Sequence, residues 1–437
     1  MEPILLKNCK IILDAFNKIR SNLDILINNK VIEEIGHNLS KKGIDIDCSN
    51  CLVVPGFFNG HTHSPMSLLR GIAEDLPLHE WLNNKVWPLE RKFKEEHYYI
   101  GAKLSIAEML KYGFTGAADM YFNMDIVAKS YIELNFRGVL CEGVFDFFNE
   151  NETEKQYKKA RDYYFRLKNL RNDLIKPSLG PHATYTCSEK LLRLIADLSS
   201  ELNALVQIHV AEDNREQELC IKNYGIREVN FLSKIGLCNE RTIYAHSVWL
   251  NEEEISLLKN FRASVVHNPI SNLKLGVGSI CNIKKLLDNG IKVCLGTDGP
   301  ASNNSLDPFE TMKISSLLQK HFYHDPAIIS SKEIFKLATY GGYNIFLPEL
   351  NAGIIKEGSI ADLAIFDLKN IRFMPLSLKD ENQIFAHLVY SSSGMKAKHV
   401  IVNGKLSVED YKLTNIDEEK LFEDFERAYN SLFENNF

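Results

Sequence analysis

Hydrophobic positions change their period twice along the chain and so divide it into three parts. In the first fifty residues, short apolar or alternating runs are bounded by Asn, Asp and Gly, which is typical of strands joined by turns. This pattern predicts strands at residues 10–13, 23–28 and 31–35. The tail is strand-like again at residues 353–358, 362–366 and 399–404. We therefore expect the two terminal segments to pair into one small β domain.

Between these ends, short apolar runs alternate with segments whose apolar residues recur at helical spacing. Eight buried strands are predicted, at residues 52–57, 114–118, 138–144, 175–179, 205–210, 242–245, 263–267 and 292–295. Predicted helices include residues 99–112, 188–202, 252–260, 283–289 and 331–344. Eight strand–helix units indicate a parallel (β/α)8 barrel, which usually takes about 250 residues.

The predicted fold is therefore α/β: a TIM-type barrel over residues 53–352, with a small β-sandwich domain built from residues 1–52 and 353–437. An open doubly wound sheet is the alternative arrangement. Such a sheet usually carries G-x-G-x-x-G after its first strand, whereas here the first strand leads into Gly60-His61-Thr62-His63.

Composition narrows the class of protein. The 437 residues are 45% hydrophobic and 25% charged, which is ordinary for a globular chain. A net charge of −6 without a Lys- or Arg-rich block argues against nucleic-acid and anionic-membrane partners. No apolar run approaches the roughly 18 residues of a membrane span, and the N-terminus shows no signal-peptide pattern.

Cysteine usage favours a reducing, cytoplasmic setting. The nine cysteines are an odd number and lie in apolar stretches, which fits reduced core thiols better than a disulfide framework. Cys48 and Cys51 have CxxC spacing, typical of a redox pair or half of a zinc knuckle. Because no second CxxC follows, we interpret them as core thiols.

Histidines and a carboxylate follow the ends of several predicted strands. His61 and His63 are two residues apart, so both point to one side of a strand. His209, His246 and Asp298 end the fifth, sixth and eighth runs. Barrel active sites are assembled at the carboxyl ends of the strands. His61, His63, His209 and Asp298 therefore predict a zinc-type site of three imidazoles and one carboxylate.

Further side chains adjoin these ligands. Glu212 follows His209 by three residues, and a carboxyl group there can carry protons to and from a substrate. Its alternative role is an acidic residue at a helix N-terminus. We assign His246 to holding or deprotonating a water molecule. His182, after the fourth strand, is interpreted as a substrate contact, and His267 as a structural residue.

Longer motifs extend this set of residues. They are PGFFNGHTH at 55–63, LLRGIAED at 68–75, GPH at 180–182, HVAE at 209–212, HNPISNLKLG at 267–276 and GTDGPASNN at 296–304. Together they resemble the amidohydrolase superfamily and, within it, the 5'-methylthioadenosine/S-adenosylhomocysteine deaminases. The resemblance runs from about residue 50 to 350, with motifs in the same order.

The resemblance implies one metal ion, zinc or iron. Two-metal relatives bridge their ions with a modified Lys at the end of strand four, where this chain has Gly180-Pro181-His182. The implied reaction is attack on C6 of an adenine ring by water that the metal activates, since a metal lowers the pKa of water toward ~7. Asp298 and His246 would take the proton of the water while Glu212 protonates the ring, and ammonia would leave an inosine compound.

The same resemblance implies how a nucleoside is held. His182 would contact it, and Glu90 matches the position that binds the ribose hydroxyls. A carboxylate suits that task because it can accept hydrogen bonds from both hydroxyls. The alternative role of Glu90 is an ion pair with Arg91 or Lys92.

One departure from the family concerns the 5' end of the substrate. Members that accept S-adenosylhomocysteine have arginines near and after the end of the third strand. This chain has Glu142 there, and residues 146–154 contain no Arg or Lys. We predict that Glu142 repels an anionic tail. The expected substrates are 5'-methylthioadenosine, 5'-deoxyadenosine or adenosine, in preference to S-adenosylhomocysteine.

Two other functions remain open from the sequence. One is a related deaminase or hydrolase acting on guanine, cytosine, a pyrimidine nucleoside or a triazine, which would use the same metal site. The other is a non-catalytic scaffold, which should lack one or more ligands. The expected partner is a small nucleoside in the cytoplasm, without nucleic acid or membrane. Homo-oligomers are common among enzymes of this kind.

Overall fold

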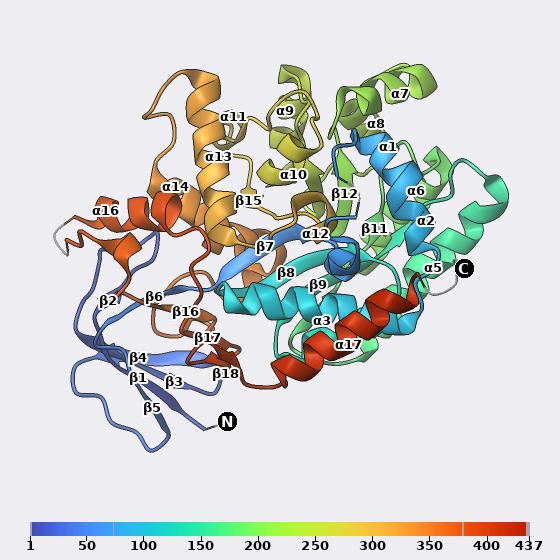
Figure 1. The fold of residues 1–437 in the computed structure, drawn as a ribbon. Coiled ribbons are helices and arrows are strands. Elements are labelled where there is room, and N and C mark those ends of the chain that lie inside the picture. Colours follow the sequence, from blue (N-terminus) through green and yellow to red (C-terminus); the bar gives the residue numbers. More distant parts are fainter. Residues whose placement is uncertain (1, 73, 378–379, 434–437) are drawn as a thin grey trace.

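The computed structural model has an α/β fold with four hydrogen-bonded sheets, and it describes residues 2–72, 74–377 and 380–433 (Figure 1). Ala73, within the motif at 68–75, lies outside the described residues. So do residues 1, 378–379 and 434–437 of the segments predicted to form the β domain. Among the described residues, every helix is too short or too polar to cross a lipid bilayer.

Two sheets contain the strands of the terminal segments. The first has the order β4-β3-β1-β5, with β1 Ile4–Cys9, β3 Leu23–Asn28, β4 Val31–Gly36 and β5 Ile44–Asp47. The second has the order β19-β18-β17-β16-β6-β2, with β2 Ile11–Ile12, β6 Cys51–Pro55, β16 Leu363–Asp367, β17 His399–Val402, β18 Lys405–Glu409 and β19 Lys412–Leu413. Strands from both ends of the chain thus pair in one sheet, β6 antiparallel to β16.

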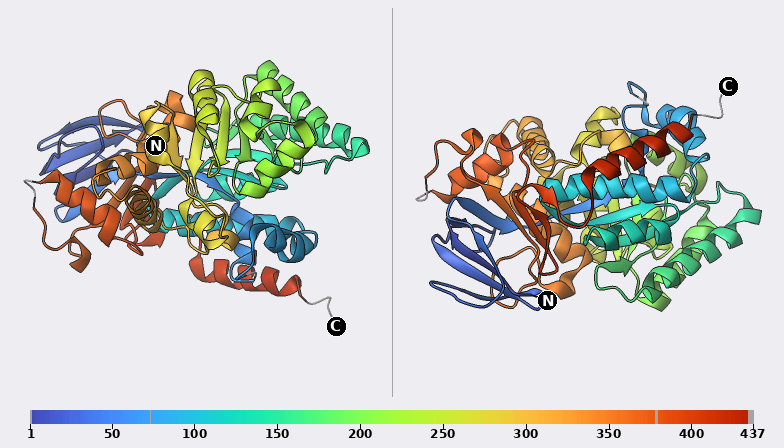
Figure 2. Two further views of the ribbon diagram at one scale, coloured as in Figure 1. Left: turned by 90° about the horizontal axis from the view of Figure 1, so that it is seen from above. Right: turned by 60° about the horizontal axis from the view of Figure 1, so that its bottom comes forward.

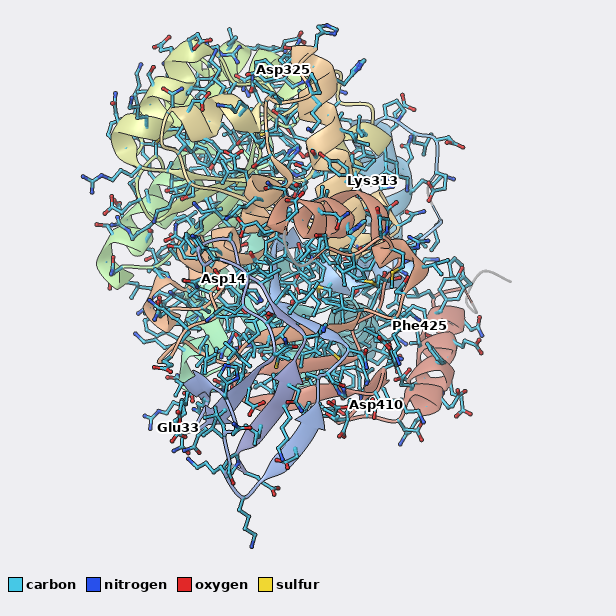
Figure 3. The ribbon with its side chains drawn as sticks, turned by 90° about the vertical axis from the view of Figure 1, so that its left-hand side faces the viewer. Asp14, Glu33, Lys313, Asp325, Asp410 and Phe425 are labelled. Carbon is cyan, nitrogen blue, oxygen red and sulfur yellow. The ribbon has the colours of Figure 1, made fainter. Side chains whose placement is uncertain are left out.

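Apolar side chains of these two sheets form one buried cluster, which includes Ile25, Val53 and Ile401. All nine cysteines are buried free thiols, and Cys48 and Cys51 belong to this cluster. Figure 3 shows Glu33 and Asp410, from the two terminal segments, at the same end of the molecule and far from Asp325.

Two sequence predictions for this region are wrong in detail. The apolar run 52–57 is not one strand, because β6 ends at Pro55 and a second strand, β7, spans Phe57–Thr62. Gly56 separates them, and a Cβ there would lie 2.1 Å from the Thr115 hydroxyl. Residues 353–358 form turns rather than a strand. Gly353 and Gly358 have left-handed φ values of 76° and 79°, which a strand does not allow.

The other two sheets are parallel. One contains β7, β8 Phe114–Tyr121, β9 Arg137–Val144 and β10 Ile175–Pro177, with β11 Gly180–Pro181 also beside β9. The other contains β12 Val206–Val210, β13 Thr242–His246, β14 Ser264–His267 and β15 Val293–Leu295. Parallel bridges from Leu179 to Val206 and from Ala183 to His209 join the two sheets. At their other edges, the Asp298 amide donates to the His61 carbonyl at 2.9 Å.

Helices follow most of these strands and surround them (Figures 1 and 2). They are α3 Glu95–Lys111, α4 Met124–Glu133, α5 Glu150–Asn169, α6 Glu189–Leu202, α7 Asn214–Tyr224, α8 Glu228–Lys234, α9 Glu252–Phe261, α10 Pro269–Lys274, α11 Ile283–Asp288, α12 Pro300–Asn303, α13 Pro308–Tyr323, α14 Ser331–Lys336 and α15 Gly342–Phe346. Several of these helices begin after a residue whose side chain caps the first turn. Ser188, for example, accepts from the Leu191 amide at the start of α6.

Further helical elements lie after β7 and near the C-terminus. After β7 come a 3-10 turn at Ser64–Leu69, α1 Leu78–Trp81, a π turn at Leu82–Val86 and α2 Trp87–Glu90. Near the C-terminus, α16 spans Glu381–Ala386 and α17 spans Glu418–Ser431. Helix α17 lies alongside α3 rather than with the terminal strands (Figure 2).

A buried ion pair connects β9 to the segment before β16. The Arg137 Nε lies 2.5 Å from Asp362 Oδ2, and the Arg137 side chain is 2% exposed. Arg137 also donates to the side-chain oxygen of Asn403 at 2.9 Å, and the backbone amide of Asn403 donates to Asp362 at 2.6 Å. The Tyr343 hydroxyl also donates to Asp362, at 2.8 Å. Every charge in this group therefore has a partner, as burial requires.

Arg137→Met should lower the free energy of unfolding by about 3 kcal/mol, because it leaves the Asp362 carboxylate buried without its cation. Urea and thermal denaturation measure the change. The matched control is Arg193→Met, since Arg193 forms an exposed pair with Glu189; its effect should stay within about 0.5 kcal/mol. Equal stability of the two variants would contradict the role given to the buried pair.

Candidate active site

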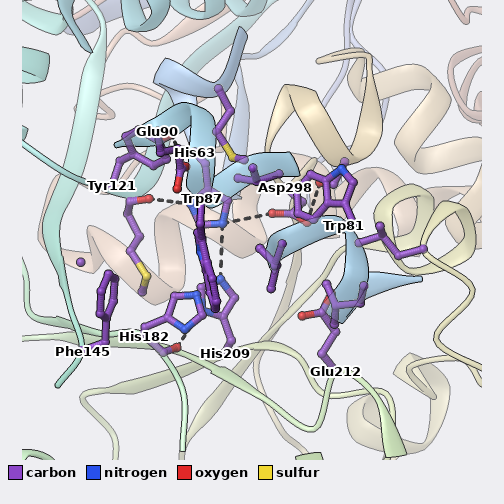
Figure 4. A pocket seen from close by; sticks show the side chains of 18 of the residues that line it. His63, Trp81, Trp87, Glu90, Tyr121, Phe145, His182, His209, Glu212 and Asp298 are labelled. Carbon is purple, nitrogen blue, oxygen red and sulfur yellow. Dashed lines mark hydrogen bonds and ion pairs between the residues drawn. The ribbon is translucent and has the colours of Figure 1, made fainter. Parts of the chain in front are cut away.

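Four predicted ligands meet at the carboxyl end of the parallel strands, and three of them, His63, His209 and Asp298, are labelled in Figure 4. His61 lies in β7, His63 directly after it, His209 in β12 and Asp298 after β15. The His63 Nε2 is 3.4 Å from His209 Nε2 and 3.3 Å from Asp298 Oδ1. The His61 Nε2 is 3.6 Å from the same Asp298 oxygen. Segments separated by more than two hundred residues thus bring their nitrogen and oxygen atoms around one point.

The outer nitrogens of two of these imidazoles are fixed by backbone carbonyls. His63 Nδ1 lies 2.5 Å from the Met120 carbonyl oxygen, and His209 Nδ1 lies 2.7 Å from that of His182. A carbonyl can only accept, so both rings carry their proton on Nδ1 and direct the lone pair of Nε2 inward. This is the usual support for a histidine that ligates a metal.

The donor set fits a metal ion. Among the described residues, the buried His61 Nε2 has no hydrogen-bond partner, which is costly unless another group takes that place. Burial, together with neighbouring histidines, lowers the pKa of His61 and His209 well below the ordinary value. Neutral imidazoles and a carboxylate are the ligands that zinc accepts in a catalytic site.

Asp298 is held so that one oxygen remains for the cluster. Its Oδ2 accepts from the hydroxyls of Ser271 and Ser302 at 2.5 and 2.9 Å. Burial alone would raise the pKa of Asp298, but contact with His63 and the nearby His246 and His61 hold it well below the ordinary value. Asp298 therefore presents an ionised Oδ1 to the histidines.

His246 and Glu212 lie beside the four ligands. His246 ends β13, and its Nδ1 is 2.9 Å from the Asn272 side-chain amide and 3.5 Å from Glu212 Oε1. Burial lowers the pKa of His246 to about 4, so the ring is neutral at pH 7. Burial and the nearby Asp298 raise the pKa of Glu212 well above its ordinary value. A buried carboxyl group with a raised pKa can keep a proton to donate.

The backbone after β12 is turned and held by two further carboxyl groups. Ala211 has a left-handed φ of 53°. Its amide donates to Glu228 at 2.7 Å, and the Glu212 amide donates to Glu216 at 2.8 Å. Glu216 and Glu228 are fully buried. Left-handed values also occur at His246 (72°) and Asp298 (61°), and such strained residues often cluster at functional sites.

Sequence reasoning missed these supporting residues. Glu216 follows Glu212 in a series of acidic residues that is typical of the exposed start of a helix. In the structure Glu216 is buried, which the sequence does not indicate. Asn272, Ser271 and Ser302 lie within recognised motifs but showed no chemistry of their own. The four-residue spacing from Glu212 to Glu216, which matches one helical turn, is the one signal that could have suggested a contact.

A cavity of about 670 Å³, including its open mouth, leads to the cluster. Its inner end is lined by His63, His182, His209, Glu212, His246 and Asp298, and the remaining wall is mainly apolar, with Trp81 and Trp87 among its residues (Figure 4). None of the described residues that line it is a lysine or arginine. The cavity therefore suits a ligand with a large apolar or aromatic surface.

Glu90 and His182 both line this cavity. Glu90 is buried and accepts a hydrogen bond from the Tyr121 hydroxyl. Burial raises the pKa of Glu90 to about 7. His182 has its Nδ1 2.9 Å from the Thr186 hydroxyl, and burial lowers its pKa to about 3. Both side chains are thus available to a ligand in the cavity.

The structure does not bring Glu142 to the cavity. Side chains alternate along a strand, and within β9 Gly143 lines the cavity while Glu142 faces the helices. Glu142 forms an ion pair of 2.7 Å with Lys159 and accepts the amides of Asn123 and Met124 at the start of α4. The direct repulsion of a substrate that the sequence suggested therefore has no contact to support it. His267 is buried and is also absent from the cavity lining.

Comparison with known proteins gives matches over most of the chain. The amidohydrolase family matches residues 52–407. A 5-methylthioadenosine/S-adenosylhomocysteine deaminase of Pyrococcus furiosus is 41% identical over 97% of this chain and 99% of its own. A 5'-deoxyadenosine deaminase of Methanococcus vannielii is 40% identical over 93% of this chain and 96% of its own. The crystal structure of an adenosine deaminase from Xanthomonas campestris with bound zinc superimposes with a TM-score of 0.90, at 28% identity and 98% coverage of both chains.

His61→Ala and His209→Ala should lose most of the metal that the unmodified chain retains after dialysis, because each removes a ligand. Inductively coupled plasma mass spectrometry measures the metal. His267→Ala is the matched control, since it removes a buried histidine at a neighbouring strand end that belongs to none of the candidate metal groups. Full metal content in His209→Ala, with circular dichroism unchanged, would contradict the ligand assignment.

Proposed function

We propose, since this chain belongs to the amidohydrolase family, that it is a metal-dependent deaminase of adenine nucleosides. It replaces the 6-amino group by oxygen and releases ammonia, giving the inosine analogue. The observation that carries this proposal is the convergence of a buried acid, Glu212, with His246 and Asp298 at the inner end of one cavity. Relatives over almost the whole length are named as deaminases of adenosine compounds.

One metal ion per subunit is proposed, zinc or iron, held by His61, His63, His209 and Asp298. Such an ion supplies hydroxide at neutral pH by lowering the pKa of water toward ~7. The zinc bound by the Xanthomonas campestris adenosine deaminase supports zinc as the first candidate.

Three side chains of this chain carry the proton transfers in the proposal. Asp298, which is ionised, accepts the proton of the attacking water through Oδ1. His246 accepts a hydrogen bond from Asn272 at Nδ1, so its own proton lies on Nε2 and is available to orient the attacking oxygen. Glu212 donates its proton to the adenine ring nitrogen beside C6. The new C6–O bond forms, Asp298 passes its proton to the departing amine as the C6–N bond breaks, and the proton left on the C6 oxygen returns to Glu212.

The nucleoside is held by Glu90 and His182 in this proposal. The Glu90 carboxylate can accept hydrogen bonds from two neighbouring ribose hydroxyls, and its position in the cavity wall supports that role. The His182 ring centroid lies 4.7 Å from that of His209, so a ligand that reaches the cluster passes beside it. The apolar wall would pack against the base and sugar.

The architecture proposed for this enzyme is a closed (β/α)8 barrel with a β-sandwich beside it. The bridges between the parallel sheets and the hydrogen bond from Asp298 to His61 support closure. The shared apolar cluster of the two terminal sheets supports the sandwich. We retain the division into residues 53–352 for the barrel and 1–52 with 353–437 for the β domain. The free thiols support a cytoplasmic setting.

Zinc-loaded protein should release ammonia from 5'-methylthioadenosine, 5'-deoxyadenosine and adenosine. S-adenosylhomocysteine should give a lower kcat/KM, because none of the described residues that line the cavity is a cation for its carboxylate. An ammonia assay with these four compounds and with guanine, cytosine and cytidine measures the order. Turnover of a free base or a pyrimidine alone would overturn the nucleoside assignment. A preference of about tenfold for S-adenosylhomocysteine, equal to about 1.4 kcal/mol, would overturn the order of substrates.

Glu212→Gln should lower kcat for adenosine by about 100-fold or more, because the amide keeps the size of the side chain but cannot donate the proton. Steady-state kinetics with equal metal loading measure the loss. Glu218→Gln, on the exposed side of α7, is the matched control and should leave kcat within about twofold. Unchanged turnover in Glu212→Gln would exclude it as the acid.

A further inference from the structure

The start of helix α8 contacts the loops that follow three successive strands, β11, β12 and β13. Glu228, the first residue of α8, is fully buried and does not line the cavity. Its Oε1 accepts a hydrogen bond from the Thr184 hydroxyl at 2.6 Å, and its Oε2 accepts one from the Ala211 amide at 2.7 Å. One carboxyl group thus bridges the loop after β11 and the turn after β12.

The preceding residue, Arg227, holds the third loop. Its Nη2 donates to the Trp249 carbonyl at 2.5 Å and to Glu254 Oε2 at 2.8 Å. The Glu254 carboxylate also accepts from the Val229 amide at 3.3 Å, so α8 is fixed to α9. The Trp249 amide donates to the Ala211 carbonyl at 2.9 Å. Both the amide and the carbonyl of Ala211 are therefore linked to the start of α8, the carbonyl through Trp249.

The same three strand ends carry side chains of the proposed reaction, namely His182, Glu212 and His246. The Glu212 Oε1 lies 3.5 Å from the His246 Nδ1. Because these side chains come from different strands, the distances between them depend on how the loops are held. A displacement of about 1 Å between reacting groups can lower a rate by about 100-fold. The contacts of α8 therefore bear on the reaction without touching the substrate.

We propose that Glu228 is a positioning residue for the deamination, and that its two hydrogen bonds set where Glu212 and His182 lie relative to each other. This inference rests on the proposed function, since it concerns the acid and the nucleoside contact of that reaction. Burial raises the pKa of Glu228 to about 7, so its charge is only partly present at neutral pH. The length of the side chain, rather than its charge, is what the two loops require.

Two variants separate length from charge. Glu228→Gln loses the charge but keeps the length, because its amide oxygen can accept from the Ala211 amide and its amide nitrogen can donate to the Thr184 hydroxyl. Glu228→Asp keeps the carboxylate but is one methylene shorter, so it cannot contact both loops. The matched control is Glu189→Asp, since Glu189 is likewise the first residue of a helix but forms an exposed pair with Arg193.

Steady-state kinetics with adenosine and equal metal loading test the proposal. In Glu228→Gln, kcat should stay within about threefold of the unmodified protein, whereas in Glu228→Asp it should fall about tenfold or more. Glu189→Asp should leave kcat within about twofold. The opposite order, with Glu228→Asp active and Glu228→Gln impaired, would assign the effect to charge and overturn the positioning role. Equal kcat in the two Glu228 variants, whether high or low, would also overturn it.

Failure of the proposed function looks different, because then no adenine nucleoside releases ammonia. Amide hydrogen exchange tests the bridge in that case, since it needs no turnover. The peptide that contains Ala211 should exchange faster in Glu228→Asp than in Glu228→Gln or Glu189→Asp, because its hydrogen bond to α8 is lost. Equal exchange in all three variants, with circular dichroism unchanged, would contradict the bridge independently of catalysis.

Discussion

Burial of imidazoles and a carboxylate around one point is the constraint on which the rest of this structure depends, and among the described residues the His61 Nε2 has no hydrogen-bond partner there. Polar groups taken out of water must find partners, and the outer atoms of the cluster do so. Backbone carbonyls hold the Nδ1 atoms of His63 and His209, and two serines hold Asp298 Oδ2. The inner atoms face one another and could hold a metal ion. The site is therefore prepared by its surroundings before any ion binds, because each ligand is oriented from behind.

Strained backbone positions and buried carboxyl groups surround the cluster. Ala211, His246 and Asp298 all adopt left-handed φ values where strands end, and each turn directs a functional group inward. Glu216 and Glu228 hold the turn at Ala211 through backbone amides. At the opposite end of β9, Arg137 and Asp362 couple this strand to the C-terminal strands. Buried polar contacts thus hold both the turn beside the cluster and the junction between β9 and the C-terminal strands.

The outer cavity wall and the histidine cluster come from different parts of the fold. The cluster and Glu212 are set by strand ends, whereas the outer cavity wall comes from α1, α2 and the loop after β9. Those segments contribute aromatic and aliphatic side chains, and the cation Lys159 is already paired with Glu142. Loops can change their side chains without disturbing the strands.

The sequence by itself determined the family, the α/β class and the candidate ligands. His61, His209 and Asp298 stand at the ends of predicted strands, within recognisable motifs. Their grouping could be predicted because the carboxyl ends of parallel strands lie together in such folds. It did not determine the break at Gly56 or the side of β9 that Glu142 faces. An apolar run looks the same whether it crosses one sheet or two, and the direction of a side chain within a strand depends on its neighbours in space. Only the tertiary structure decided where the strand breaks and which way Glu142 faces, and only the tertiary structure showed which carboxyl groups are buried.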